Sequence, residues 1–150
     1  MKTGRLFTGI GVTLALALSL PAAQAAEFVS IGGDKVNLRE GPGTDQPRQW
    51  VVSRGYPLKI LERRNGWAKV KDYEDDVGWV AERLLSDNRT VLVTEDLVNV
   101  RAGPTTEKPV AFQAENKVLL QYLGQEGDWV HVQHADGDEG WVYAPLVWGE

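Results

Sequence analysis

Residues 36–44 read Val-Asn-Leu-Arg-Glu-Gly-Pro-Gly-Thr, and residues 98–106 repeat this stretch as Val-Asn-Val-Arg-Ala-Gly-Pro-Thr-Thr, 62 positions later. Two shorter motifs, Trp-x-x-Val at 67 and Gly-Trp-Val at 78, also return after 62 residues. Without any gap, residues 34–88 are identical to residues 96–150 at 17 of 55 positions. The sequence therefore contains one unit twice, and this repeat is the first guide to its fold.

A unit of 62 residues has the size of a minimal independent domain, which buries only about 60% of its unfolded surface. We predict two tandem domains, residues 27–87 and 88–150, with almost no linker between them. The connection has room only within residues 86–90, so we expect a fairly stiff pair.

Composition excludes several classes of protein. The 150 residues carry 16 basic and 21 acidic side chains and no cysteine. The acidic balance disfavours nucleic acid as a partner. Without cysteine there are no disulfides, thiolate metal sites or cysteine nucleophile.

The N-terminal segment, residues 1–26, is typical of a cleavable signal peptide. Two basic residues, Lys2 and Arg5, precede the uncharged run 6–20, and Ala23-Gln24-Ala25 fits the small-x-small cleavage pattern. The run is shorter than the roughly 20 residues of a membrane span, although an uncleaved anchor is the alternative. We expect a periplasmic or secreted protein, with no membrane contact after cleavage and a mature charge of −7.

The mature sequence predicts an all-β fold. Short β-branched runs alternate with turn signals, and Asn65-Gly66 favours a type I′ hairpin turn. No segment keeps a helical apolar period for three turns. The strands expected in the first unit cover residues 28–31, 35–38, 50–52, 58–62, 67–70 and 78–81.

The order of motifs resembles the bacterial SH3 (SH3b) domain: Asn-x-Arg-x-Gly-Pro, a hairpin, Trp-x-x-Val, Gly-Trp-Val and a closing leucine, Leu84 or Leu146. This resemblance covers both units and implies two SH3-like β-barrels of about five to seven strands each. It also implies an exported protein, since members of the family are often attached to cell-wall hydrolases or act as wall-targeting modules. Thr105 replaces Gly43 of the first copy, so we expect the second Gly-Pro loop to bend differently.

Arg39 and Arg101 immediately precede the Gly-Pro turns. One interpretation is structural: with the neighbouring asparagines, they hydrogen-bond the turn backbone and fix its shape. The other is functional: each guanidinium binds a carboxylate on a peptide ligand.

The tryptophans are further candidates for ligand binding. Strand alternation places Trp67 and Trp129 opposite the aliphatic core, and Trp79 and Trp141 face away from their neighbouring valines. Partly exposed tryptophans suit sugar rings or extended peptides, and Tyr143 is a weaker candidate for the same surface. Alternatively, the Gly-Pro loops fold over these rings and make a second small core.

Charge is unequally divided between the units. Residues 27–88 carry 10 basic and 11 acidic side chains, whereas residues 89–150 carry 4 and 10. Arg63-Arg64, Lys69 and Lys71 give the first unit a local basic edge, and Gln125-Glu126 align with the two arginines. We predict that the units bind one ligand unequally, with neutral drift of solvated turns as the alternative.

No catalytic, metal or cofactor site is predicted. The acidic stretches 74–76 and 136–139 lack the oxygen spacing of a calcium loop, and His131 and His134 should point to opposite faces of a strand. No serine lies in a nucleophile-elbow context. A hydrolase with an unusual SH3-like site is the weakest of the functions considered.

We therefore expect a non-enzymatic, exported protein whose two SH3b domains contact cell-wall peptidoglycan or a wall-associated protein. The alternative is a periplasmic protein–protein interaction scaffold with no wall affinity. Two linked weak sites would gain avidity if one ligand engages both.

Overall fold

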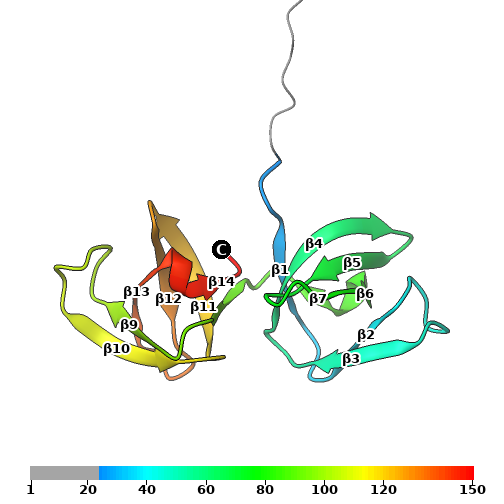
Figure 1. Ribbon diagram of the computed structural model, residues 1–150, viewed down its shortest axis with the longest axis horizontal. Coiled ribbons are helices and arrows are strands. Elements are labelled where there is room, and N and C mark those ends of the chain that lie inside the picture. The colour runs from blue at the N-terminus through cyan, green and yellow to red at the C-terminus, as the bar shows by residue number, and fades with distance from the viewer. Residues whose placement is uncertain (1–23) are drawn as a thin grey trace, which may run out of the picture.

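The computed structural model describes residues 24–150, which form two separate antiparallel sheets of seven strands each (Figure 1). The predicted all-β architecture of two tandem barrels is confirmed. The predicted signal peptide lies almost entirely outside the described residues. Within residues 24–150, no helix is long and apolar enough to cross a membrane.

The first sheet has the strand order β3-β2-β6-β5-β4-β1-β7. A 3-10 turn, Glu82–Leu84, separates its last two strands in the chain. The strands are β1 Phe28–Ile31, β2 Val36–Arg39, β3 Arg48–Val52, β4 Pro57–Arg64, β5 Trp67–Lys71, β6 Val77–Ala81 and β7 Leu85–Ser86.

The second sheet repeats this topology in the order β10-β9-β13-β12-β11-β8-β14. A second 3-10 turn, Ala144–Leu146, stands at the equivalent place. The strands are β8 Thr90–Val93, β9 Leu97–Arg101, β10 Val110–Glu115, β11 Leu119–Glu126, β12 Trp129–Gln133, β13 Glu139–Tyr143 and β14 Val147–Trp148. The predicted division after residue 87 falls in the short connection between Ser86 and Thr90.

Strand alternation decides which side chains form each core. In β12 the two valines, Val130 and Val132, are fully buried, while Trp129 and His131 on the other face are half-buried, as predicted. The same pattern holds in β5, where Val70 is buried. Each barrel thus has its own small aliphatic core, made mainly of valine and leucine.

The predicted hairpin turn at Asn65-Gly66 is confirmed, because both residues have positive φ, at 50° and 81°. The expectation that Thr105 bends the second Gly-Pro loop differently is wrong. In the first loop, Gly43 donates its N–H to the Gly41 carbonyl, and its own carbonyl accepts from the Gln46 N–H. In the second loop, Thr105 makes the same two bonds with Gly103 and Lys108. Gly43 does not use a positive φ, so threonine fits the same turn.

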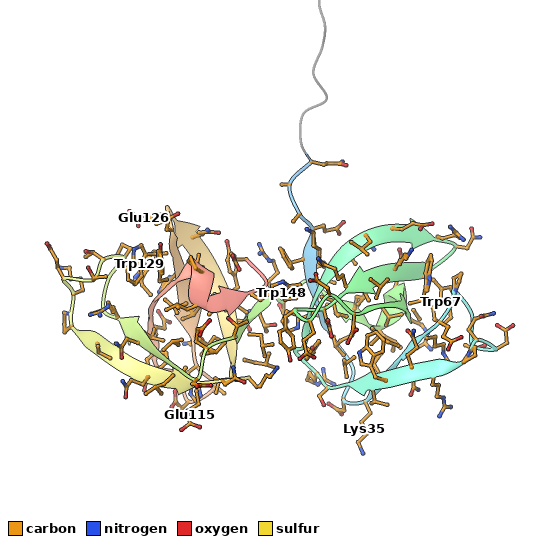
Figure 2. The ribbon with its side chains drawn as sticks, in the orientation of Figure 1. Lys35, Trp67, Glu115, Glu126, Trp129 and Trp148 are labelled. Atoms are coloured by element: carbon orange, nitrogen blue, oxygen red, sulfur yellow. The ribbon has the colours of Figure 1, made fainter. Side chains whose placement is uncertain are left out.

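The two barrels pack against each other at a junction where Phe28 of the first barrel lies beside Arg89 and Trp148 of the second. The guanidinium of Arg89 lies 4.0 Å from the ring of Tyr122 and 5.8 Å from that of Phe28, and donates to the Gly149 carbonyl at 2.9 Å. Phe28 meets Trp148 edge to face, with ring centroids 5.1 Å apart. Figure 2 shows Trp148 where the two barrels meet.

Hydrogen bonds between the barrels add to this junction. The buried Ser30 hydroxyl donates to the Asn88 carbonyl at 2.6 Å, and the Thr90 hydroxyl donates to the Gly55 carbonyl. Lys117 lies 3.7 Å from the ring centre of Tyr73. In the resulting arrangement of the two barrels, the Gly-Pro loop between β2 and β3 lies at one end of the molecule's long axis. The Gly-Pro loop between β9 and β10 lies at the other end (Figure 1).

Candidate functional site

Each barrel has a groove bounded by its Gly-Pro loop, by the tryptophan of its Trp-x-x-Val motif (Trp67 or Trp129) and by its 3-10 turn. The first groove has a volume of about 520 Å³. Its wall consists of Asn37, Arg39, Thr44, Gly66, Trp67, Ala81, Glu82, Arg83 and Leu84.

The second groove occupies the equivalent place in the second barrel and has a volume of about 530 Å³. Its wall consists of Leu97, Val98, Asn99, Arg101, Pro104, Thr105, Thr106, Trp129, Tyr143 and Leu146. Asparagine, arginine, threonine, tryptophan and leucine therefore line both grooves at repeat-equivalent positions. Figure 2 shows that Trp67 and Trp129 belong to different barrels.

The motif arginines have a structural contact within each groove. The Arg39 guanidinium donates to the Gln46 carbonyl at 2.8 Å, and Arg101 donates to the Lys108 carbonyl at 3.0 Å. Each bond ties the far side of a Gly-Pro loop to the strand that precedes it. A guanidinium has five N–H donors, so each arginine keeps donors for a ligand after making this bond.

Trp67 and Trp129 line the grooves, but the second tryptophan of each unit does not. Trp79 is only 7% exposed, so the expectation of an accessible ring is wrong at this position. The guanidinium of Arg64 covers it, 5.3 Å from the ring centre. The second barrel has Glu126 in place of Arg64, and Trp141 instead stacks on His131, with centroids 4.6 Å apart and planes 11° from parallel.

Tyr143 adds an aromatic wall to the second groove alone. Its ring centroid is 5.7 Å from that of Trp129, the two planes meet at 52°, and the side chain is 42% exposed. The two residues are partners across β12 and β13. The first barrel has Ala81 at the equivalent position, so Trp67 has no aromatic neighbour there.

Ion pairs neutralise much of the predicted basic edge of the first barrel. Arg63 bridges Glu27 and Glu82, Arg64 pairs with Glu62, and Lys71 pairs with Asp75. The hydrogen bonds that Arg63 donates to the two glutamates, to Glu27 foremost, raise its pKa. The hydrogen bond from Lys71 lowers the pKa of Asp75. These exposed pairs leave little free charge at the hairpin itself.

Three carboxylates meet outside the grooves. Ligand oxygens of Asp72, Glu74 and Asp76 lie within 4.8 Å of one another. The buried Asp72 accepts the backbone N–H groups of residues 74 and 76, at 2.9 and 3.0 Å, and so holds the turn. Burial and then Asp72 raise the pKa of the Tyr56 phenol, whose hydroxyl is 3.4 Å from that carboxylate. These contacts account for the cluster as part of the fold.

The sequence pointed to the arginines, the tryptophans and Tyr143 but not to the other groove residues. Thr44 and Thr106, together with the closing leucines Leu84 and Leu146, line the grooves in both barrels. These threonines and leucines are identical in the two copies of the repeat, and this identity could have marked them as candidate groove residues. Leu97 and Arg83 differ between the copies and had no such signal.

The geometry defines a class of protein: a tandem of small antiparallel barrels, each with a groove beside its longest loop. The chain belongs to the bacterial SH3 domain family, whose model matches residues 32–87 and 94–149. The prediction of two tandem SH3b domains is thereby confirmed.

Comparison with a curated relative gives 23% identity over 140 residues to the protein of Bacillus subtilis (strain 168) named "Putative N-acetylmuramoyl-L-alanine amidase YrvJ". The match covers 86% of this chain, which spans only 26% of that relative.

Solved structures with similarity to the chain include NlpC2 and NlpC1 from Trichomonas vaginalis. Each is 13% identical with a TM-score of 0.39; the matches cover 86% and 91% of this chain and 50% and 51% of those chains. An NlpC/P60 family protein from Bacillus cereus ATCC 10987 is 14% identical with a TM-score of 0.38, covering 81% of this chain and 56% of that one.

Proposed function

We propose that this protein is an exported, non-enzymatic binding protein that contacts cell-wall peptidoglycan through the two grooves. The observation that carries the proposal is the duplication of the grooves: the same motif residues gather at the same place in both barrels. A structural role alone needs the arginine and the glycines of the loop, but it does not need a half-exposed tryptophan beside them.

The chemistry of the grooves supports this ligand. A half-buried tryptophan presents an apolar ring face, which suits the C–H face of a sugar or the backbone of an extended peptide. Asparagine, threonine and arginine next to the ring supply hydrogen bonds to hydroxyl, amide or carboxylate groups. Peptidoglycan carries all of these groups on its glycan and stem peptides.

The curated relative adds independent support. It is named as a putative N-acetylmuramoyl-L-alanine amidase. The amide bond between N-acetylmuramic acid and L-alanine joins the glycan of peptidoglycan to the stem peptide. This chain matches only about a quarter of that relative's length. We infer that the shared part supplies wall contact, which favours a wall-associated location for this protein.

The absence of enzymatic activity is part of the proposal. Among the described residues, neither groove is lined by a serine, cysteine or histidine, so neither holds a Ser–His or Cys–His pair. We expect no release of muropeptides when the protein alone is incubated with purified sacculi. Release above the buffer control would contradict this part.

Co-sedimentation with purified peptidoglycan tests the proposal. We expect the protein lacking residues 1–26 to sediment with sacculi and the double variant Trp67→Ala/Trp129→Ala to remain in solution. The matched control is Leu61→Ala/Leu123→Ala, which removes two exposed apolar side chains at equivalent positions outside both grooves. Circular dichroism checks that both variants are folded.

The outcomes separate the two functions considered. Sedimentation that depends on the tryptophans supports wall binding at the grooves. A wild-type protein that stays in solution contradicts wall binding and favours a periplasmic scaffold for protein partners. Sedimentation that survives in the double variant contradicts the assignment to the grooves.

A further inference from the structure

The two grooves share one frame but differ where strand β6 or β13 runs into the 3-10 turn. At three consecutive positions the first groove has Ala81, Glu82 and Arg83, whereas the second barrel has Tyr143, Ala144 and Pro145. The first and third of these changes matter most for a ligand. One exchanges a methyl group for an aromatic ring, and the other exchanges a guanidinium for a proline ring.

The first groove carries unneutralised positive charge. Glu82, its only carboxylate, is held by Arg63 at 3.1 Å. Arg39 and Arg83, in contrast, form no ion pair with any of residues 24–150 within 4.0 Å. Arg83 is exposed, and Lys69 lies on the same face of β5 as Trp67. A ligand with a carboxylate finds two guanidinium groups here.

The second groove has the opposite character. Arg101 is its only charged lining residue, and the acidic Asp128 and Glu126 stand in the adjoining hairpin turn. Trp129 and Tyr143 form two faces of an aromatic corner, and the 55% exposed Leu97 extends its apolar wall. The hydroxyls of Thr105 and Thr106 add polar groups to the same groove. Such a surface suits a neutral ring with apolar C–H faces and polar edges.

From these differences we propose that the two grooves take different parts of the wall polymer, an inference that rests on the proposed function. The second groove binds the neutral chain of N-acetylated amino sugars, with a sugar ring against Trp129 and Tyr143. The first groove binds a carboxylate of the acidic stem peptide, with Arg39 and Arg83 as its partners. The duplicated sites have therefore diverged in ligand class.

Two single substitutions test this division in the intact two-barrel protein. Tyr143→Ala installs the residue that the first copy has at this position, so the barrel tolerates it. Arg83→Gln removes one exposed charge from the first groove and keeps hydrogen-bonding capacity. The probes are chitotetraose, a neutral chain of four N-acetylglucosamine units, and the tripeptide L-alanyl-γ-D-glutamyl-L-lysine, titrated by calorimetry or protein NMR.

We expect Tyr143→Ala to weaken chitotetraose binding about tenfold, which corresponds to about 1.4 kcal/mol, and to leave tripeptide binding unchanged. Arg83→Gln should do the reverse. Tripeptide affinity should also fall steeply between low and high salt because screening weakens the ion pair, whereas chitotetraose affinity should change little.

The failure of this inference is distinguishable from the failure of the proposed function. If sacculi sediment the wild-type protein but one variant weakens both probes equally, the division is wrong and wall binding stands. The division is also wrong if sacculi sediment the protein but neither probe binds. If the wild-type protein does not sediment, the proposed function fails, and this inference fails with it.

Discussion

Replacing Arg89 by methionine should destabilise the second barrel at the place where it meets Phe28 of the first. The substitution keeps a flexible apolar stem but removes the guanidinium that lies between Tyr122 and Phe28 and donates to the Gly149 carbonyl. The cation–π contact at 4.0 Å contributes about 1–2 kcal/mol, and the charge-assisted hydrogen bond contributes about 1.5–3 kcal/mol.

One feature of Arg89 opposes these gains. Its Nε is buried and has no hydrogen-bond partner, which costs about 1–3 kcal/mol. The net loss in Arg89→Met is therefore about 2 kcal/mol. For a two-barrel chain of this size, the melting temperature should fall by about 6–8 °C. Differential scanning calorimetry measures this fall, which should belong mainly to the second barrel, because Tyr122 and Gly149 lie in that barrel together with Arg89.

The matched control is Arg54→Met. Arg54 has one acidic partner, Asp34 at 2.8 Å, and the two side chains are 63% and 85% exposed. Exposed ion pairs contribute about 0–1 kcal/mol, so the control should melt within about 4 °C of the wild type. If Arg89→Met and Arg54→Met lower the melting temperature equally, the contacts of Arg89 contribute no more than an exposed ion pair.

Three further outcomes are expected. Gly140→Ala should lower the free energy of unfolding by about 2 kcal/mol, because the new Cβ would lie 2.7 Å from the Arg101 backbone oxygen. The control is Gly124→Ala, whose new Cβ would have no neighbour within 4 Å. This control should unfold at the same urea concentration as the wild type. Arg101→Ala should increase hydrogen–deuterium exchange in the second Gly-Pro loop, because the guanidinium no longer holds a loop carbonyl; unchanged protection would contradict the structural role of this arginine. A backbone N–H and then His134 lower the pKa of Asp136 from 3.8, so the stabilisation from its ionised form is present above pH 3.8 and is lost as the pH falls through the lower folded value. NMR titration should show this pKa rise part of the way back in His134→Ala.

The repeat and the strand alternation predicted most of the fold. The gapless 62-residue offset required two copies of one barrel, and alternation correctly separated Val130 and Val132 from Trp129 and His131. These features depend on neighbours along one strand, which the sequence shows directly. The last short strands, Leu85–Ser86 and Val147–Trp148, were missed because two residues are too few for a period.

Contacts between strands were harder to predict. The burial of Trp79 depends on Arg64, which comes from another strand of the same sheet. The junction depends on Phe28, Arg89 and Trp148, which lie near the ends of the two units. Phe28 and its repeat partner, Thr90, differ completely in character. A comparison of the two copies therefore gave no signal for the contact between them.

The placement of the two Gly-Pro loops at opposite ends of the long axis has a mechanical consequence (Figure 1). A short glycan or peptide segment seated beside one loop leaves the other groove free. If the grooves bind the wall as proposed, the second groove would face a different polymer strand. The protein would then connect two strands of the network instead of binding one chain twice.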